Sequence, residues 1–198
     1  MGRDVNEGGE SLAAICMRVI GAVVVTFAGS AAIAQPAPPA PLATPNPTYA
    51  SIVLEQEVAR PAAEVWKRIG GFCDMQIWFP GAKCQISSGK DGDLGAVRTL
   101  NGSTQEILVG KTDLSYTYTQ PVRLGQAYNL YHGTLEARPV TATTSRLVYS
   151  LLMDNSMLTD DAARKAALDA NRAITTRVLG NMRIVAEGGS LPAPRPRP

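Results

Sequence analysis

Two oppositely charged residues flank a short turn near the middle of the chain. Arg98 and Glu106 lie on either side of Asn101-Gly102-Ser103, a sequence typical of a β-hairpin turn. A two-residue turn would set Arg98 opposite Gln105, whereas a three-residue turn with glycine at the bulge sets it opposite Glu106. We favour the second pairing, which puts both charges on the same face as Leu108. An inward pair predicts a ligand anchor or an acid–base site, and a structural salt bridge at the sheet surface remains the alternative.

Tyrosines recur on one face of three further predicted strands. Successive side chains of a strand point to opposite faces, so residues two apart share a face. Tyr116, Tyr118, Tyr131 and Tyr149 fall on the less charged face of their strands, which we expect to point inward, whereas Tyr128 falls on the opposite face. A tyrosine offers an apolar wall with one polar group, which suits an apolar or aromatic ligand that carries a few oxygens. The predicted ligand-binding residues on this face are Tyr116, Tyr118, Tyr131, Tyr149, Leu108, Leu135 and Leu151.

Other catalytic and cofactor chemistry has little support in the residue types. His132 is the only histidine, and alternation puts it on the outer face of its strand, so neither a zinc cluster nor a Ser-His-Asp set is expected. The glycine-rich run 89–95 has no helix after it and predicts a hairpin turn rather than a phosphate loop. We therefore expect no cofactor and no metal. The net charge of +2 comes with no basic stripe, which argues against nucleic-acid binding.

Strands and helices can be predicted from the periodicity and the turn residues. A β-rich start is followed by two short helices, six further strands and one long helix, in a domain of about 140 residues. An antiparallel sheet wrapped around the long helix satisfies every element, so the fold class is α+β. The expected elements are a strand at Tyr49–Val58, a helix that begins at Pro61, a short helix at Phe72–Ile77, strands at Ala82–Ser88, Leu94–Leu100, Thr104–Val109, Leu114–Thr119, Gln126–Arg138 and Thr144–Met153, and a helix at Thr159–Glu187 capped by Thr159.

Small residues mark the first half of the long helix. Its apolar positions step by three and four residues and form one stripe that we expect to face the sheet. The stripe begins with alanines and gains bulk towards its end, which predicts a void beneath the first half of the helix. Close packing of helix on sheet is the alternative. The stripe comprises Ala163, Ala167, Ala170, Ile174, Val178, Met182 and Val185, of which Ala170 and Ile174 are further candidate ligand-binding residues.

The N-terminal region has the pattern of a secretory signal peptide. An apolar stretch at 19–27 precedes small residues and an Ala32-Ile33-Ala34 cleavage site. We expect residues 1–34 to be this leader, with Met17 as the true initiator because the preceding residues are acidic. An uncleaved anchor or a core helix are the alternatives. Residues 35–48 form a Pro/Ala-rich linker, 49–187 the folded domain, and 188–198 a disordered Pro-rich tail.

Two cysteines remain after the leader is removed. An oxidising compartment would favour a disulfide between Cys73 and Cys84. The spacing permits this bond without proving it, because the distance between the two Cα atoms is unknown. Two buried free thiols remain the alternative.

Three short motifs together resemble a known family. They are Trp78-Phe79-Pro80-Gly81, the run Gly95–Leu100 followed by Glu106, and Tyr131-His132-Gly133-Thr134-Leu135. In their order and spacing they resemble the START-like superfamily, in its polyketide cyclase/dehydrase (SRPBCC) group, over Tyr49 to Glu187. This resemblance implies a helix-grip fold, in which a curved antiparallel sheet of about seven strands surrounds a long C-terminal helix. It also implies a deep cavity for lipids, hormones, polyketides or phenolics, and an inward position for Glu106.

The resemblance and the residues leave three functional hypotheses. We expect an exported, periplasmic or secreted, protein that binds a hydrophobic or aromatic small molecule. The alternative is a cofactor-free cyclase or lyase, in which Glu106 acts as a base while Arg98 and a tyrosine polarise an oxygen. The third is an accessory protein of a periplasmic dehydrogenase. Membrane contact is expected only through an uncleaved leader, and the oligomeric state stays open.

Overall fold

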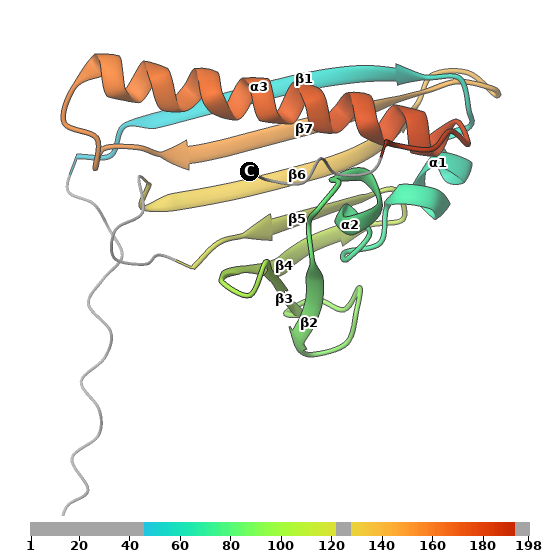
Figure 1. Cartoon of the computed structure of the whole chain (residues 1–198), viewed down its shortest axis with the longest axis horizontal. Helices are drawn as coiled ribbons and strands as arrows, with labels where there is room; N and C mark the ends of the chain where they lie inside the picture. Colours follow the sequence, from blue (N-terminus) through green and yellow to red (C-terminus); the bar gives the residue numbers. More distant parts are fainter. Residues whose placement is uncertain (1–45, 122–127, 193–198) are drawn as a thin grey trace, which may run out of the picture. The chain divides into compact units, whose positions relative to one another are not determined.

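The computed structural model describes residues 46–121 and 128–192, which lie in one compact unit, Ala40–Pro198. Within them, a seven-stranded antiparallel sheet packs against one long helix (Figure 1). The strand order across the sheet is β1-β7-β6-β5-β4-β3-β2. In chain order the elements are β1 (Tyr49–Val58), α1 (Ala62–Ile69), α2 (Met75–Trp78), β2 (Cys84–Ser88), β3 (Val97–Leu100), β4 (Thr104–Thr112), β5 (Ser115–Thr119), β6 (Leu130–Pro139), β7 (Ser145–Asp154) and α3 (Asp161–Ala186).

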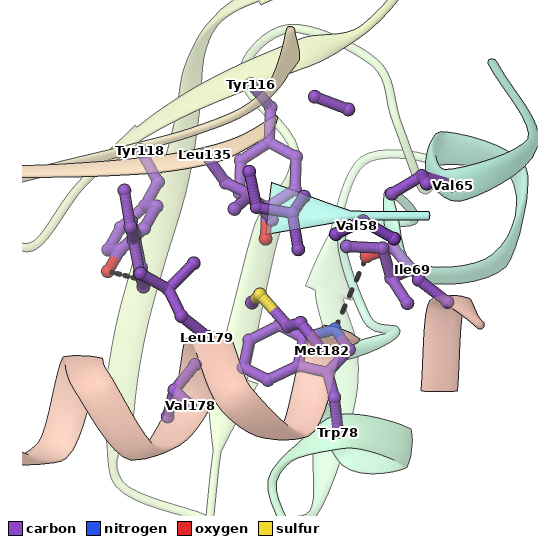
Figure 2. Close-up of a cluster of buried hydrophobic side chains, with 14 of the residues drawn as sticks. Val58, Val65, Ile69, Trp78, Tyr116, Tyr118, Leu135, Val178, Leu179 and Met182 are labelled. Carbon is purple, nitrogen blue, oxygen red and sulfur yellow. Dashed lines mark hydrogen bonds between the residues drawn. The ribbon is translucent and has the colours of Figure 1, made fainter. Parts of the chain in front are cut away.

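Helix α3 lies along β1 on one face of the sheet, and α1 and α2 lie near its C-terminal half (Figure 1). Burial of apolar side chains between these layers holds them together, since each apolar Å² removed from water contributes about 25 cal/mol. Figure 2 shows the centre of this core, where side chains from the sheet, α1, α2 and α3 meet. The helix residues buried in it are Val65 and Ile69 of α1, Trp78 of α2, and Val178, Leu179 and Met182 of α3.

The predicted α+β helix-grip fold is confirmed, and so are most of the element positions. β1 has the predicted bounds, and β5 and β7 differ from prediction by one residue at most at each end. β2 and β3 begin later than predicted, and β4 continues to Thr112. β6 begins at Leu130, and the first two residues of its predicted range lie outside the described residues.

The hairpin between β3 and β4 has the predicted three-residue turn. Leu100 pairs with Thr104 across the turn, which sets Arg98 opposite Glu106. Asn101 and Gly102 both have positive φ angles, of 50° and 74°. Asparagine and glycine are the residues that adopt this backbone conformation most readily, so the local sequence determines the pairing.

Two helix starts differ from the prediction. Asp160 rather than Thr159 caps α3, because its carboxylate accepts a hydrogen bond from the backbone N–H of Ala163 at 2.7 Å. The second short helix begins at Met75 instead of Phe72. Phe72 and Cys73 precede it in a turn, where the Phe72 carbonyl and the Cys73 sulfur bond to the neighbouring strands.

The inward stripe predicted for the long helix is only partly correct. The fully buried residues of α3 all lie in its second half, from Thr175 onwards. Of the predicted stripe, Ala163 and Ala167 are half-buried and Ala170 is exposed. The first half of the helix is covered less by the sheet, so its alanines are not required for close packing.

Several predicted segments lie outside the described residues. These are the whole leader 1–34, most of the linker 35–48 and the end of the tail 188–198. The predicted end of the long helix is confirmed, because α3 stops at Ala186 and Gly188 has a positive φ of 94°. No helix in the described part of the chain is long and apolar enough to cross a membrane.

A disulfide joins Cys73 and Cys84, with their Cα atoms 5.5 Å apart. The sequence permitted this bond, and the structure contains it. The bond ties the turn before α2 to the first residue of β2, at one edge of the sheet. A cross-link of this kind stabilises a fold chiefly because it restricts the unfolded chain.

We expect the Cys73→Ser/Cys84→Ser double variant to be less stable than the wild type by about 2–3 kcal/mol, the value for a loop of this length. The measurement is the free energy of unfolding in guanidinium chloride. Reductant added to the wild type should bring it close to the variant, and should leave the variant unchanged. Equal stabilities of oxidised wild type and variant would contradict the prediction.

Candidate functional site

A buried ion pair joins two neighbouring strands, β3 and β4, on the inner face of the sheet. Arg98 on β3 and Glu106 on β4 are 1% and 3% exposed. Nε and a terminal nitrogen of Arg98 lie 2.7 and 2.5 Å from Glu106 Oε2. The prediction that the pair faces inward is therefore confirmed, and the surface salt bridge is excluded. Removing one member of such a pair costs about 3–5 kcal/mol, because the other charge is left uncompensated.

Aromatic rings and a backbone carbonyl complete the surroundings of the guanidinium. Its central carbon lies 4.2 Å from the ring centroid of Phe72, 5.0 Å from that of Tyr118 and 5.6 Å from that of Tyr116. Arg98 also donates a hydrogen bond to the carbonyl oxygen of Phe72. Burial alone would lower the pKa of Arg98, but Tyr116, Glu106 and the other tyrosines outweigh this effect and raise it. The side chain therefore stays a cation.

The second carboxylate oxygen of Glu106 also accepts a hydrogen bond. Glu106 Oε1 accepts a hydrogen bond from the side-chain amide of Gln120 at 2.8 Å. The oxygen of that amide in turn accepts a hydrogen bond from the hydroxyl of Tyr128. Arg98, Glu106, Gln120 and Tyr128 thus form one chain of hydrogen bonds from β3 towards the start of β6.

Three tyrosines lie beside this chain. The hydroxyls of Tyr118 and Tyr149 are 2.8 Å apart and share a hydrogen bond, and the ring of Tyr131 lies 6.3 Å from that of Tyr118. Desolvation by burial raises the pKa of all three well above the usual value, so each is a neutral phenol at physiological pH. They can donate and accept hydrogen bonds but do not act as phenolates.

These tyrosines form one wall of a small cavity, which we call the tyrosine cavity. Its volume is about 100 Å³. The sheet supplies the polar side, and α2 and α3 supply most of the apolar side. It is lined by Met75, Trp78, Phe79, Arg98, Leu100, Glu106, Tyr118, Tyr131, Tyr149, Asn171, Ile174, Thr175 and Val178.

A glycine in β6 gives Tyr118 its position. Gly133 is the cross-strand partner of Tyr118. A Cβ atom at Gly133 would lie 2.4 Å from the ring carbon that bears the Tyr118 hydroxyl. The ring therefore lies directly over the backbone of β6, in space that any other residue would fill.

A larger opening lies on the other side of Phe72 and Tyr116, and we call it the aromatic cleft. Its volume is about 450 Å³, and it shares no lining residue with the tyrosine cavity. It lies between the end of α1, the β2–β3 connection and the β4–β5 hairpin. Its lining includes Trp66, Gly70, Gly71, Phe72, Asp91, Leu108, Lys111, Asp113 and Tyr116.

The structure brings together some of the predicted site residues and separates others. Arg98, Glu106, Tyr118, Tyr131 and Tyr149 meet at the tyrosine cavity, as expected. Tyr116 and Leu108 are buried but line the aromatic cleft. Leu135 and Leu151 are core residues that line neither space, because other side chains cover them.

The two candidates on α3 also differ from each other. Ile174 is 45% exposed and lies at the edge of the tyrosine cavity, so its predicted position is partly right. Ala170 is exposed and lines neither space, which makes its predicted inward position wrong. The helix contributes Asn171, Ile174, Thr175 and Val178 to the cavity, so the void lies against the middle of α3 rather than beneath its first half.

Sequence reasoning missed the polar residues of the cavity that come from outside the strands. Asn171 and Thr175 of α3, and Gln120 after β5, which does not line the cavity but binds Glu106, are common residue types without a distinctive pattern. Met75, Trp78 and Phe79 of the α2 region were not predicted as lining residues either. The Trp78-Phe79 motif was a signal for them, because a short aromatic helix at a sheet edge needs an apolar surface to cover.

The described residues around the tyrosine cavity differ in the chemistry that they offer. The described residues contain no group of three or more His, Cys, Asp or Glu side chains that could hold a metal ion. His132 lies on the outer face of β6, opposite Leu152, as predicted. The groups that converge on the cavity are one ion pair with its hydrogen bonds satisfied and a set of neutral tyrosines.

Tyr116 and Tyr118, two residues apart on β5, allow a matched test of this description. The Tyr116 hydroxyl is buried beside the Arg98 guanidinium and makes no hydrogen bond of ordinary geometry with the described residues, whereas the Tyr118 hydroxyl is paired (Figure 2). We expect Tyr116→Phe to raise the free energy of unfolding by about 1 kcal/mol, because it removes an unsatisfied polar group. Tyr118→Phe should lower it by about 1–2 kcal/mol, because it leaves the Tyr149 hydroxyl alone. Chemical denaturation measures the free energy of unfolding of both variants. A change in the same direction for both substitutions would contradict the description.

The sequence matches a family model over the whole domain. The model is that of polyketide cyclase / dehydrase and lipid transport, and the match covers residues 49–187. It confirms the resemblance predicted from the motifs, over the same residues. No curated protein matches the sequence.

Solved structures share the fold over most of the chain. A protein from Nitrosospira multiformis is 25% identical with a TM-score of 0.57, and the alignment covers 68% of this chain and 94% of that one. A protein from Thermobifida fusca is 19% identical with a TM-score of 0.59, covering 72% and 98%. Truncated norcoclaurine synthase from Thalictrum flavum is 13% identical with a TM-score of 0.57, covering 75% and 99%. At such identities the last two show likeness of fold alone.

Proposed function

We propose that this chain, which belongs to the polyketide cyclase / dehydrase and lipid transport family, is a carrier or sensor that binds one small ring-shaped molecule in the tyrosine cavity. The fold is of a kind that binds small hydrophobic ligands. The observation that carries the proposal is the pair of tyrosine hydroxyls, Tyr118 and Tyr149, in an otherwise largely apolar cavity.

The hydroxyl pair favours a ligand with a hydrogen-bond acceptor. Two hydroxyls have two protons, and the hydrogen bond between Tyr118 and Tyr149 uses one of them. The other proton can be donated to an oxygen of the ligand. Because burial keeps both groups neutral, this donor persists throughout the physiological pH range.

The volume of the cavity limits the size of the ligand. A dry cavity of about 150 Å³ takes up benzene. The tyrosine cavity, at about 100 Å³, therefore suits a molecule of a single ring, with a small outward movement of a lining side chain. Ile174 is the lining residue with the greatest freedom for this movement, because it is 45% exposed.

The state of Glu106 supports a carrier rather than a cyclase or lyase. A general base needs a free lone pair within reach of the substrate proton. Three of the roughly four acceptor sites of the Glu106 carboxylate are occupied, two on Oε2 by Arg98 and one on Oε1 by Gln120, which limits the approach of a substrate proton. We propose that the pair orders the sheet and contributes a polar end to the cavity, and that no proton is transferred there.

We expect the protein to bind cyclohexanone about five-fold more tightly than methylenecyclohexane, which has the same shape without the oxygen. This factor corresponds to one hydrogen bond worth about 1 kcal/mol. The measurement is ligand-observed NMR titration of the purified protein. In the Tyr118→Phe/Tyr149→Phe double variant, which removes both hydroxyls of the pair, the difference should largely disappear, and equal binding by the wild type would contradict the oxygen preference.

Two tryptophan variants locate the site. Ile174→Trp should fill the mouth of the cavity and abolish binding of both probes. Leu152→Trp, at a residue of similar exposure on β7, should leave binding unchanged. A natural ligand should also be detectable by native mass spectrometry of protein from its own source. If the protein converts that ligand and Glu106→Gln stops the conversion without loss of binding, the carrier proposal is wrong and the enzyme alternative is right.

We further propose that the chain is exported and functions in the periplasm or outside the cell. The disulfide between Cys73 and Cys84 supports this proposal, because such bonds persist mainly in oxidising compartments. The signal-like pattern of residues 1–34 supports it independently.

We expect the full chain, expressed in a Gram-negative host, to appear in the periplasm with Gln35 as its first residue. Intact-mass spectrometry of the periplasmic fraction measures this. Ala34→Arg, at the cleavage position, should block processing, whereas Ala40→Arg in the linker should not. An unprocessed wild-type chain in the cytoplasm would contradict the export proposal.

A further inference from the structure

The aromatic cleft has the shape and chemistry of a second binding site. Its volume of about 450 Å³ is within the usual range for small-molecule sites, and it is several times larger than the tyrosine cavity. Phe72 and Tyr116 separate the two spaces from within the core. The proposed function does not use the cleft.

Two adjacent glycines shape one wall of the cleft. A Cβ atom at Gly70 would lie 2.4 Å from the indole of Trp66, so the absence of a side chain lets this indole fold over the end of α1. A Cβ atom at Gly71 would lie 2.6 Å from the carboxylate of Asp74. Asp74 instead accepts a hydrogen bond from the backbone N–H of Gly71 at 2.6 Å, directly behind the cleft.

Three aromatic rings form the floor and side of the cleft. The ring of Tyr116 lies 5.7 Å from that of Trp66 and 5.6 Å from that of Phe72. Trp66 is half-buried, whereas Phe72 and Tyr116 are almost fully buried. The negative faces of such rings attract cations, and tryptophan attracts them most strongly.

The charges around the cleft are also suited to a cation. Asp91 and Asp113 lie in its lining, from two different connections between strands. Burial raises the pKa of Asp74, and the charge of Asp91 adds to the rise. Lys111 is the basic residue in the lining, and its ammonium donates to the carbonyl of Gly92 at 2.5 Å. Arg98, behind Phe72, is neutralised by Glu106.

From these contacts we infer that the aromatic cleft binds an organic cation, a protonated or quaternary amine on a small apolar body. The cationic group lies against Trp66, between Asp91 and Asp113. The apolar body contacts Leu108 and the ring of Tyr116.

A series of three molecules with the same shape tests the charge preference. Choline, 3,3-dimethyl-1-butanol and 3,3-dimethylbutanoate differ mainly in charge. We expect choline to bind roughly three- to thirty-fold more tightly than the neutral alcohol, the factor expected for one cation–π contact, and the carboxylate to bind most weakly. The readout is the indole N–H resonance of Trp66 in an NMR titration of the full domain. The resonance of Trp78, which lines the tyrosine cavity and whose indole donates to the Ile69 carbonyl, reports separately on any binding in that cavity.

Variants on exposed loops keep the test independent of folding. Asp91→Asn with Asp113→Asn should weaken choline binding at least five-fold and leave the neutral alcohol unchanged. The matched control is the Asp160→Asn/Asp161→Asn variant, which alters two exposed carboxylates at the far end of α3. This variant should leave the binding of choline and of the neutral alcohol unchanged. Equal binding of choline and the alcohol, tighter binding of the carboxylate, or no effect of the Asp91/Asp113 variant would overturn the inference.

Binding at the aromatic cleft can be tested separately from the proposed binding in the tyrosine cavity. Ile174→Trp, which fills the tyrosine cavity, should leave choline binding at Trp66 unchanged. The Asp91/Asp113 variant should bind cyclohexanone as the wild type does. The proposal for either site can therefore be contradicted while the proposal for the other site stands.

Discussion

The guanidinium of Arg98 is a permanent charge that the fold holds almost completely away from water. Three separate parts of the chain meet its requirements. Glu106 supplies the countercharge from the next strand, Phe72 supplies a carbonyl from the turn before α2, and the tyrosines of β5 supply ring faces. Because a buried charge without its partners costs several kcal/mol, these parts have to assemble together. The ion pair therefore coordinates the packing of the sheet with that of the short helices.

The disulfide between Cys73 and Cys84 constrains the same region, around Phe72 and Arg98. It fixes Cys73, and with it the preceding residue Phe72, to β2, which pairs with the strand that carries Arg98. The carbonyl and the ring of Phe72 are thus held in place by a covalent bond one residue away. Phe72 also separates the tyrosine cavity from the aromatic cleft. One cross-link at the edge of the sheet therefore maintains the boundary between two binding spaces.

The features that could be predicted from the sequence are those that depend on neighbouring residues. The pairing of Arg98 with Glu106 follows from the residues of one turn, and the inward face of the tyrosines follows from alternation. The position of the void could not be predicted from the small residues of α3, because the sheet covers the first half of this helix less than the second half. Nor could the aromatic cleft, since Trp66 comes from α1, and Asp91 and Asp113 come from two connections between strands, and their approach depends on the whole fold. The role of the Phe72 carbonyl leaves no trace in the sequence, because every residue has the same group.

Gly133 has a consequence for how ligand preference can change in this chain. The Tyr118 ring lies against the backbone of β6 because Gly133 has no side chain there. Any other residue at this position would push the tyrosine ring towards α3 and reduce the cavity. Under the proposed function, a substitution of Gly133 would therefore change ligand binding through the displaced Tyr118 ring. The position of the Tyr118 ring in the cavity wall therefore depends on the absence of a Cβ atom at Gly133.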